Sequence, residues 1–283
     1  MENLSDQTNQ KITEVNQSEL KNFGEFSKEP RFADLWDKCV YNLLYDPEKF
    51  TEEFSQLLAE YGVDKSSKIL DTCAGSGFPA LDMYKNGYSE VFVVDGFDDA
   101  VALFNEKAEE AGLDIRSERC TFKELAKHFE AEQFKALICR GTIWYAEEGG
   151  WNQDFIPSRD GALKAVRDAI ATFHSLLETG GVLYVDKFKD TEVPHKDTVG
   201  TFKVAGKEKE LIFCTQLDRD TDIRRAHMIT KDVETEEETF KPNVTYNLKE
   251  EELEQILQEV GFSIVKPDLV EEKFFTSWLA IKN

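Results

Sequence analysis

Residues 69–77 end an apolar run on an acidic side chain and then enter a turn of small residues. Asp71 is the acidic residue, and Gly75 and Gly77 lie in the turn. A turn with so few side chains lets a cofactor approach the backbone closely, as in the nucleoside-binding turns of doubly wound α/β folds. We therefore expect a cofactor to contact Asp71, Cys73, Ala74, Gly75 and Gly77.

A second acidic residue, Asp95, ends the next apolar run. Its separation from Asp71 is close to the roughly 20 residues after which such folds place the acid that binds ribose hydroxyls. Gly96 and Phe97 follow, and the Phe97 ring could form a wall of an adenine pocket. Each feature alone is more often a plain turn or a helix cap, but the two together favour a nucleoside-containing cofactor. The glycine pattern differs from the GxGxxG of dinucleotide-binding proteins.

A buried parallel sheet would bring these residues together, and the hydropathy pattern predicts one. Four short apolar runs, at 68–71, 91–95, 136–139 and 182–186, alternate with helical stretches. Continuous apolar strands that alternate with helices are typical of a parallel sheet covered on both faces. The sequence therefore predicts an α/β fold.

The helices around these strands are marked by their caps and apolar spacing. Asp46 and Pro47 begin one helix, and Gly62 ends it. Further helices are expected at 122–129, at 163–177 and from Asn247 to Gly261, and two last strands should follow. Between 195 and 245, alternating stretches predict an inserted antiparallel layer. Residues 1–28 are polar and are expected to be flexible, whereas 29–283 are expected to form one domain.

The amino-acid composition limits the kinds of partner and cellular environment that we expect. The formal net charge of -22 repels phosphate backbones and anionic lipids, so we expect neither nucleic acid nor membrane as a partner. No apolar run reaches the roughly 18 residues of a membrane helix, and 1–28 lack the apolar stretch of a secretory signal. The five cysteines show no CxxC spacing, which favours a reducing cytoplasm and no metal site. Whether the chain forms a homo-oligomer stays open.

The order of these motifs resembles class I S-adenosyl-L-methionine (SAM)-dependent methyltransferases. The residues that carry the resemblance are 70–81, Asp95, 137–141 and 180–186, within roughly 50–190. The resemblance implies a Rossmann-like, seven-stranded, mostly parallel sheet with helices on both faces, its last strand antiparallel, and SAM as the cofactor. An N-terminal helical lid and the inserted layer would cover the site. Further cofactor contacts are then expected from Trp36, Cys120, Thr121, Arg140 and Gly141.

A narrower resemblance is to the glycine/sarcosine N-methyltransferase group, carried by 138–141, 180–186 and 226–229. That group usually has Asn and Arg where Thr142 and Lys187 stand here. Lysine lacks the bidentate fork that grips a carboxylate, so the acceptor could differ from glycine. The resemblance implies methyl transfer to a small soluble amine. The residues expected at the acceptor are Tyr41, Thr142, Trp144, Tyr145 and Lys187, with Tyr45 and Tyr145 as candidate catalytic groups.

Other functions remain open at this stage. The acceptor atom could be an oxygen, a sulfur or a carboxylate of another small metabolite, or the chain could bind SAM without catalysis. A DNA-methylating enzyme is disfavoured, because residues 140–143 read Arg-Gly-Thr-Ile instead of an Asn/Asp-Pro-Pro-Tyr/Phe tetrad. An NAD-dependent short-chain enzyme is disfavoured because the helices after the strands lack a Tyr-x-x-x-Lys pair.

Overall fold

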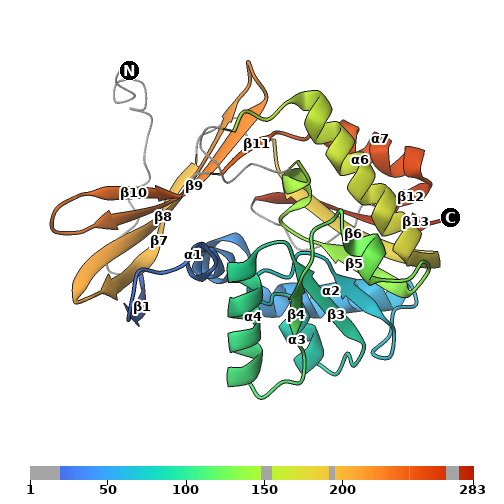
Figure 1. The fold of residues 1–283 in the computed structure, drawn as a ribbon, viewed down its shortest axis with the longest axis horizontal. Helices are drawn as coiled ribbons and strands as arrows, with labels where there is room; N and C mark the ends of the chain where they lie inside the picture. Colours follow the sequence, from blue (N-terminus) through green and yellow to red (C-terminus); the bar gives the residue numbers. More distant parts are fainter. Residues whose placement is uncertain (1–19, 148–154, 191–194, 242, 266–273) are drawn as a thin grey trace.

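The computed structural model describes residues 20–147, 155–190, 195–241, 243–265 and 274–283. Its strands form two sheets, one of seven strands and one of six. The seven-stranded sheet lies among the larger helices, and the six-stranded sheet projects to one side of it (Figure 1). This second layer is the insertion that the alternating pattern of 195–245 predicts.

The seven-stranded sheet has the Rossmann-like order β12-β13-β6-β5-β2-β3-β4. Its neighbours from β6 to β4 pair in parallel, and β13 pairs antiparallel with both β6 and β12. The expected mostly parallel sheet with an antiparallel last strand is therefore confirmed. The strands are β2 (Ile69–Asp71), β3 (Val91–Asp95), β4 (Ser117–Arg119), β5 (Phe134–Cys139), β6 (Leu177–Phe188), β12 (Phe262–Val265) and β13 (Phe275–Lys282).

Helices cover both faces of this sheet. Tyr184 of β6 packs against Phe54 of α2, with ring centroids 4.9 Å apart. The next residue of β6 pairs with Trp278 of β13, whose indole N–H donates to Glu254 of α7. Because successive strand residues point to opposite faces, α2 and α7 lie on opposite sides of the sheet. The helices are α2 (Pro47–Glu60), α3 (Ala80–Lys85), α4 (Asp98–Glu110), α5 (Leu125–His128), α6 (Arg159–Leu176) and α7 (Glu250–Val260).

The six-stranded sheet has a parallel strand at one edge. β1 (Lys21–Phe26) pairs in parallel with β7, and the remaining strands are antiparallel. β1 lies within the polar stretch 1–28, which the sequence suggested would be flexible. The Phe26 ring packs on Phe202 of β7 at 5.5 Å, and this apolar contact explains the added strand. The other strands are β7 (His195–Val204), β8 (Lys207–Asp218), β9 (Ile223–Asp232), β10 (Glu238–Lys241) and β11 (Val244–Tyr246).

Helix boundaries follow the caps in one case and depart from them in another. Asp46 caps α2 by accepting from the Lys49 N–H, as its sequence predicts. The last helix begins at Glu250 and not near Asn247, because Glu252 reaches back to the Lys249 N–H instead. The Asn247 side chain is used elsewhere and joins Arg224.

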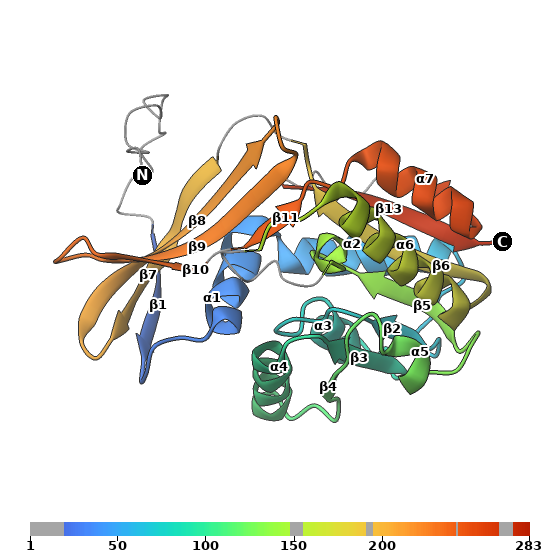
Figure 2. The same ribbon diagram turned by 45° about the horizontal axis from the view of Figure 1, so that its top comes forward.

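A short helix, α1 (Phe32–Cys39), continues into a single π-helical turn, η2 (Val40–Leu44). α1 lies between the six-stranded sheet and α4 in both views of the ribbon (Figures 1 and 2). Its Trp36 ring lies 6.2 Å from Phe213 of β8, so apolar contact ties the helix to the inserted sheet. This is the N-terminal helical lid that the sequence predicts.

Candidate active site

A cavity of about 700 Å³ lies at the carboxyl ends of β2, β3, β4 and β5. Crevices at this edge of an open α/β sheet are the usual ligand sites of such folds. The lid helix α1 and strand β10 also contribute to its wall. The sequence-predicted site residues that line it are Trp36, Tyr45, Cys73, Ala74, Gly75, Asp95, Gly96, Phe97, Cys120, Thr121, Arg140, Gly141, Thr142 and Tyr145.

Two glycines with positive φ shape the turn after β2. Gly75 has φ +53°, and a Cβ built there would meet no atom within 4 Å. Gly77 has φ +119°, and a Cβ there would overlap the Leu81 side chain. Gly75 therefore leaves free space facing the cavity, whereas Gly77 allows the turn to pack against α3.

Asp95 connects this turn to the end of β3. Its carboxylate accepts from the Gly75 N–H and the Phe97 N–H, both at 2.9 Å. Burial raises the pKa of Asp95 to about 6, although these backbone hydrogen bonds lower it. A carboxylate in this position lines the cavity and has further lone pairs that could accept from ligand hydroxyls.

Asp71 lies beneath the turn, with 1% of its surface exposed, and is not among the lining residues. Its Oδ1 accepts from the Cys73 N–H at 3.2 Å. Its Oδ2 is buried and has no hydrogen-bond partner among the described residues. Burial raises the pKa of Asp71 to about 7. A buried acceptor without a partner is costly, so this oxygen suits a donor supplied by a ligand or by a bridging water.

Arg140 places a positive charge in the cavity wall. Its guanidinium carbon lies 3.6 Å from the centroid of Tyr45 and 4.1 Å from that of Phe78. These ring faces stabilise the buried cation and hold it at the cavity wall. Together, Asp71 and Arg140 offer a carboxylate and a guanidinium near one end of the cavity, which suits the two charges of an amino-acid tail.

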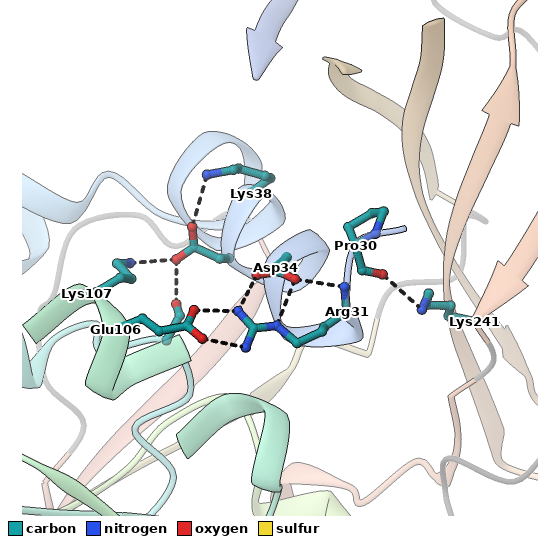
Figure 3. A network of polar contacts seen from close by, with 9 residues as sticks. Pro30, Arg31, Asp34, Lys38, Glu106, Lys107 and Lys241 are labelled. Atoms are coloured by element: carbon teal, nitrogen blue, oxygen red, sulfur yellow. Dashed lines mark hydrogen bonds and ion pairs between the residues drawn. The ribbon is translucent and has the colours of Figure 1, made fainter. Parts of the chain in front are cut away.

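The lid helix is fastened to the cofactor turn and to α4. Asp37 of α1 accepts from the Ser76 hydroxyl at 2.5 Å and from the Lys107 ammonium of α4 at 2.8 Å. Arg31, just before the helix, pairs with Asp34 and with Glu106 of α4, as Figure 3 shows. Because Ser76 belongs to the turn that lines the cavity, its hydrogen bond to Asp37 links the lid helix directly to that turn.

We expect Asp37→Asn to speed the release of SAM by about tenfold, because a hydrogen bond to a charged group contributes on the order of 1.5–3 kcal/mol. The asparagine keeps the shape but loses the ion pair with Lys107. Release can be followed by displacing labelled SAM with excess unlabelled ligand. Asp82→Asn removes a partly exposed ion pair with Lys85 of α3 and should leave the release rate unchanged. Equal release rates for Asp37→Asn and the wild type would show that the lid is held by other contacts.

Several sequence-predicted residues do not line the cavity. Lys187 is 2% exposed, and its ammonium binds Asp190 at 3.0 Å. Trp144 packs on Phe188 at 4.8 Å, and Tyr41 packs on Phe78 at 5.7 Å. Their expected contacts with an acceptor stay a prediction. The predicted site residues outside the lining are Tyr41, Asp71, Gly77, Trp144 and Lys187.

Other lining residues were missed by the sequence reasoning. Phe240 and Lys241 come from β10, in the inserted layer, and Lys241 donates to the Pro30 carbonyl beside the lid (Figure 3). Glu147 follows the short helix η3 (Ile143–Tyr145), and burial raises its pKa. No local signal marks β10 as part of a site, because its position depends on long-range pairing with β9.

Within the residues that the structure describes, no group of three or more His, Cys, Asp or Glu side chains could hold a metal ion. Among the same residues, none of the helices is both long and apolar enough to cross a membrane.

Comparison with known proteins identifies the class. Residues 69–155 match a family model described as a methyltransferase domain. This stretch is therefore a methyltransferase domain, and the sheet that contains it has the class I SAM-dependent methyltransferase fold. Among curated proteins, no sequence matches.

Solved structures agree with this fold at low sequence identity. A SAM-dependent methyltransferase from Clostridium acetobutylicum ATCC 824 has a TM-score of 0.63 at 15% identity, over 89% of this chain and 98% of that one. The sugar N-methyltransferase KedS8 from Streptoalloteichus sp ATCC 53650 has a TM-score of 0.63 at 15% identity, over 90% of this chain and 95% of that one. SAM-bound CalS10, an amino pentose methyltransferase from Micromonospora echinaspora, has a TM-score of 0.63 at 13% identity, over 90% of this chain and 99% of that one. The resemblance to the glycine/sarcosine group stays a prediction.

Proposed function

We propose that this chain transfers a methyl group from SAM to the amine of a small soluble acceptor. The proposal rests on one observation: Asp95, the turn at Gly75 and the Arg140 guanidinium, which lies over the Tyr45 ring, line the same cavity. Ribose hydroxyls would donate to Asp95, and the adenine ring would lie against Phe97 and near Cys120 and Thr121.

The described residues fit the rest of the cofactor. The unpartnered Oδ2 of Asp71 would accept from the ammonium of the methionine tail, directly or through a water. Arg140 would bind its carboxylate, and the free space beside Gly75 would admit its chain. When bound, SAM supplies an electrophilic methyl group. The chain's contribution is to orient the acceptor nitrogen toward that methyl and to exclude water by means of the aromatic lid residue Trp36.

The acceptor would be a small amine, of the glycine or sarcosine kind or a related one. Lys187, which was expected to grip an amino-acid carboxylate, is held by Asp190 and lies outside the cavity lining. This placement favours a related amine without a carboxylate over glycine and sarcosine themselves. Two structural neighbours are named as a sugar N-methyltransferase and an amino pentose methyltransferase, and an amino sugar is therefore the second candidate.

Formation of S-adenosylhomocysteine with a panel of acceptors tests the proposal. The panel should hold glycine, sarcosine, amino sugars free and nucleotide-linked, a thiol series and a carboxylic acid series. We expect turnover with amines and none above background with thiols or acids. Turnover confined to thiols, acids or hydroxyls, or SAM binding without turnover of any acceptor, would contradict it.

A further inference from the structure

Asp186 lies near the carboxyl end of β6, in a motif to which the proposed cofactor site assigns no role. The side chain is fully buried. Its Oδ1 accepts from the Gly141 N–H at 2.5 Å, and its Oδ2 lies 3.3 Å from the Tyr45 hydroxyl. Gly141 and Tyr45 line the cavity, whereas Asp186 does not. The buried Asp186 carboxylate thus accepts hydrogen bonds from two groups that line the cavity, the Gly141 N–H and the Tyr45 hydroxyl.

The ionisable groups around Asp186 come from three elements. Arg140 follows β5, Tyr45 follows η2, and Tyr184 belongs to β6 itself, with its hydroxyl 3.5 Å from Oδ2. Lys187, the next residue in the chain, points to Asp190 instead. Burial raises the pKa of Asp186 to about 6, and Arg140, the Gly141 N–H and both tyrosines lower it. This carboxylate is therefore a stronger base than an exposed aspartate and better able to take up a proton.

Tyr45 is placed to pass a proton to this carboxylate. Its ring is fixed between the Arg140 guanidinium at 3.6 Å and the Phe275 ring, whose centroid lies 5.0 Å away. The Ser76 hydroxyl also lines the cavity and binds a carboxylate, but that carboxylate, Asp37, is already paired with the ammonium of Lys107.

We propose that Tyr45 and Asp186 form a proton relay that deprotonates the acceptor amine. The proposal rests on the proposed amine-methylating function. Tyr45 would be the catalytic residue that touches the amine, and Asp186, which acts through Tyr45, a positioning residue. A protonated amine has no lone pair with which to attack, so its proton must leave before methyl transfer.

The relay balances in two steps. The ammonium N–H bond breaks and its proton passes to the Tyr45 oxygen, while the Tyr45 hydroxyl proton passes to Oδ2 of Asp186. The amine becomes neutral, Tyr45 remains a phenol, and Asp186 becomes a neutral acid. The neutral nitrogen would then take the methyl group that bound SAM supplies, forming the N–C bond as the C–S bond breaks and leaving the positive charge on nitrogen. After the product leaves, Asp186 returns its proton through Tyr45 to water.

The test compares Tyr45→Phe, Asp186→Asn and the double variant with the wild type, using an amine that the wild type methylates. Tyr45→Phe keeps the ring that packs on Arg140 but loses the hydroxyl. We expect each variant to lower kcat at pH 7 by about 100-fold. The double variant should be no worse than either single one, because both remove the same relay. Calorimetric SAM binding and thermal unfolding show whether each variant is folded.

The pH profile separates a relay from a purely structural role. The wild-type kcat/KM should fall about tenfold per pH unit below about pH 6, where Asp186 becomes protonated, and should be level above it. In Tyr45→Phe, kcat/KM should instead keep rising about tenfold per pH unit toward the pKa of the acceptor itself. Tyr184→Phe is the matched control, because its hydroxyl also lies near Asp186 but does not line the cavity. It should keep the level rate at neutral pH, with the acidic limb moved to slightly higher pH because the Tyr184 hydrogen bond lowers the pKa of Asp186.

Three outcomes would overturn the relay. One is a wild-type kcat and profile for Tyr45→Phe, which decides the matter even where Asp186→Asn does not fold. Another is strictly additive losses in the double variant. The third is loss of the acidic limb in Glu147→Gln, since Glu147 also lines the cavity and could take the proton directly. In each case the wild type still methylates the amine, so the relay fails while the proposed function stands.

Discussion

Asp95→Ala is expected to weaken SAM binding by at least about 100-fold, because two hydrogen bonds to a charged acceptor contribute on the order of 3 kcal/mol or more. The carboxylate would lose the ribose hydroxyls, and the Gly75 N–H would lose the partner that holds the turn in place. Isothermal calorimetry with SAM and with S-adenosylhomocysteine measures the effect directly.

Asp99→Ala provides the matched control for this variant. Asp99 also lines the cavity and carries the same charge, but it is exposed at the start of α4. Its removal should change the affinity by no more than about twofold, since exposed charges contribute little. If Asp95→Ala and Asp99→Ala bound SAM equally well, Asp95 would not be the ribose acceptor.

Gly75→Val should also reduce SAM affinity by about 100-fold, because overfilling a closely packed site costs about 1–3 kcal/mol. The valine Cβ would meet no protein atom within 4 Å, so the new side chain would occupy the space that faces the cavity. The loss would therefore arise from exclusion of the cofactor and not from a collapsed turn. Calorimetry again gives the affinity, and thermal unfolding gives the cost to the fold.

Gly112→Val separates this exclusion from backbone strain. Gly112 has φ +66° and, like Gly75, no atom within 4 Å of its added Cβ, but it does not line the cavity. Both valines bear a similar conformational strain of about 1–2 kcal/mol. We expect both variants to lose similar stability and only Gly75→Val to lose SAM. Matched losses of affinity in the two variants would falsify the steric explanation.

Local patterns were sufficient to predict the sheet and its two acids. Asp71 and Asp95 each end a continuous apolar strand, and parallel strands place such ends along one edge of the sheet. The cap at Asp46 likewise depends on a neighbour only three residues away. These features could be predicted because each is determined by short-range hydropathy or by a local hydrogen bond.

Features set by distant contacts escaped prediction. Strand β1 forms because Phe26 meets Phe202 of β7, a partner far along the chain. Phe240 enters the cavity wall only because β10 pairs with β9. Sequence periodicity carries no information about such pairings.

The most direct test of the cofactor site is a crystal structure with S-adenosylhomocysteine. We expect the ribose hydroxyls within hydrogen-bond distance of the Asp95 carboxylate, the amino-acid tail between Asp71 and Arg140, and the sulfur facing the side that Tyr45 lines. A nucleoside bound away from the Gly75 turn, or a cavity filled by the chain's own side chains, would contradict the account.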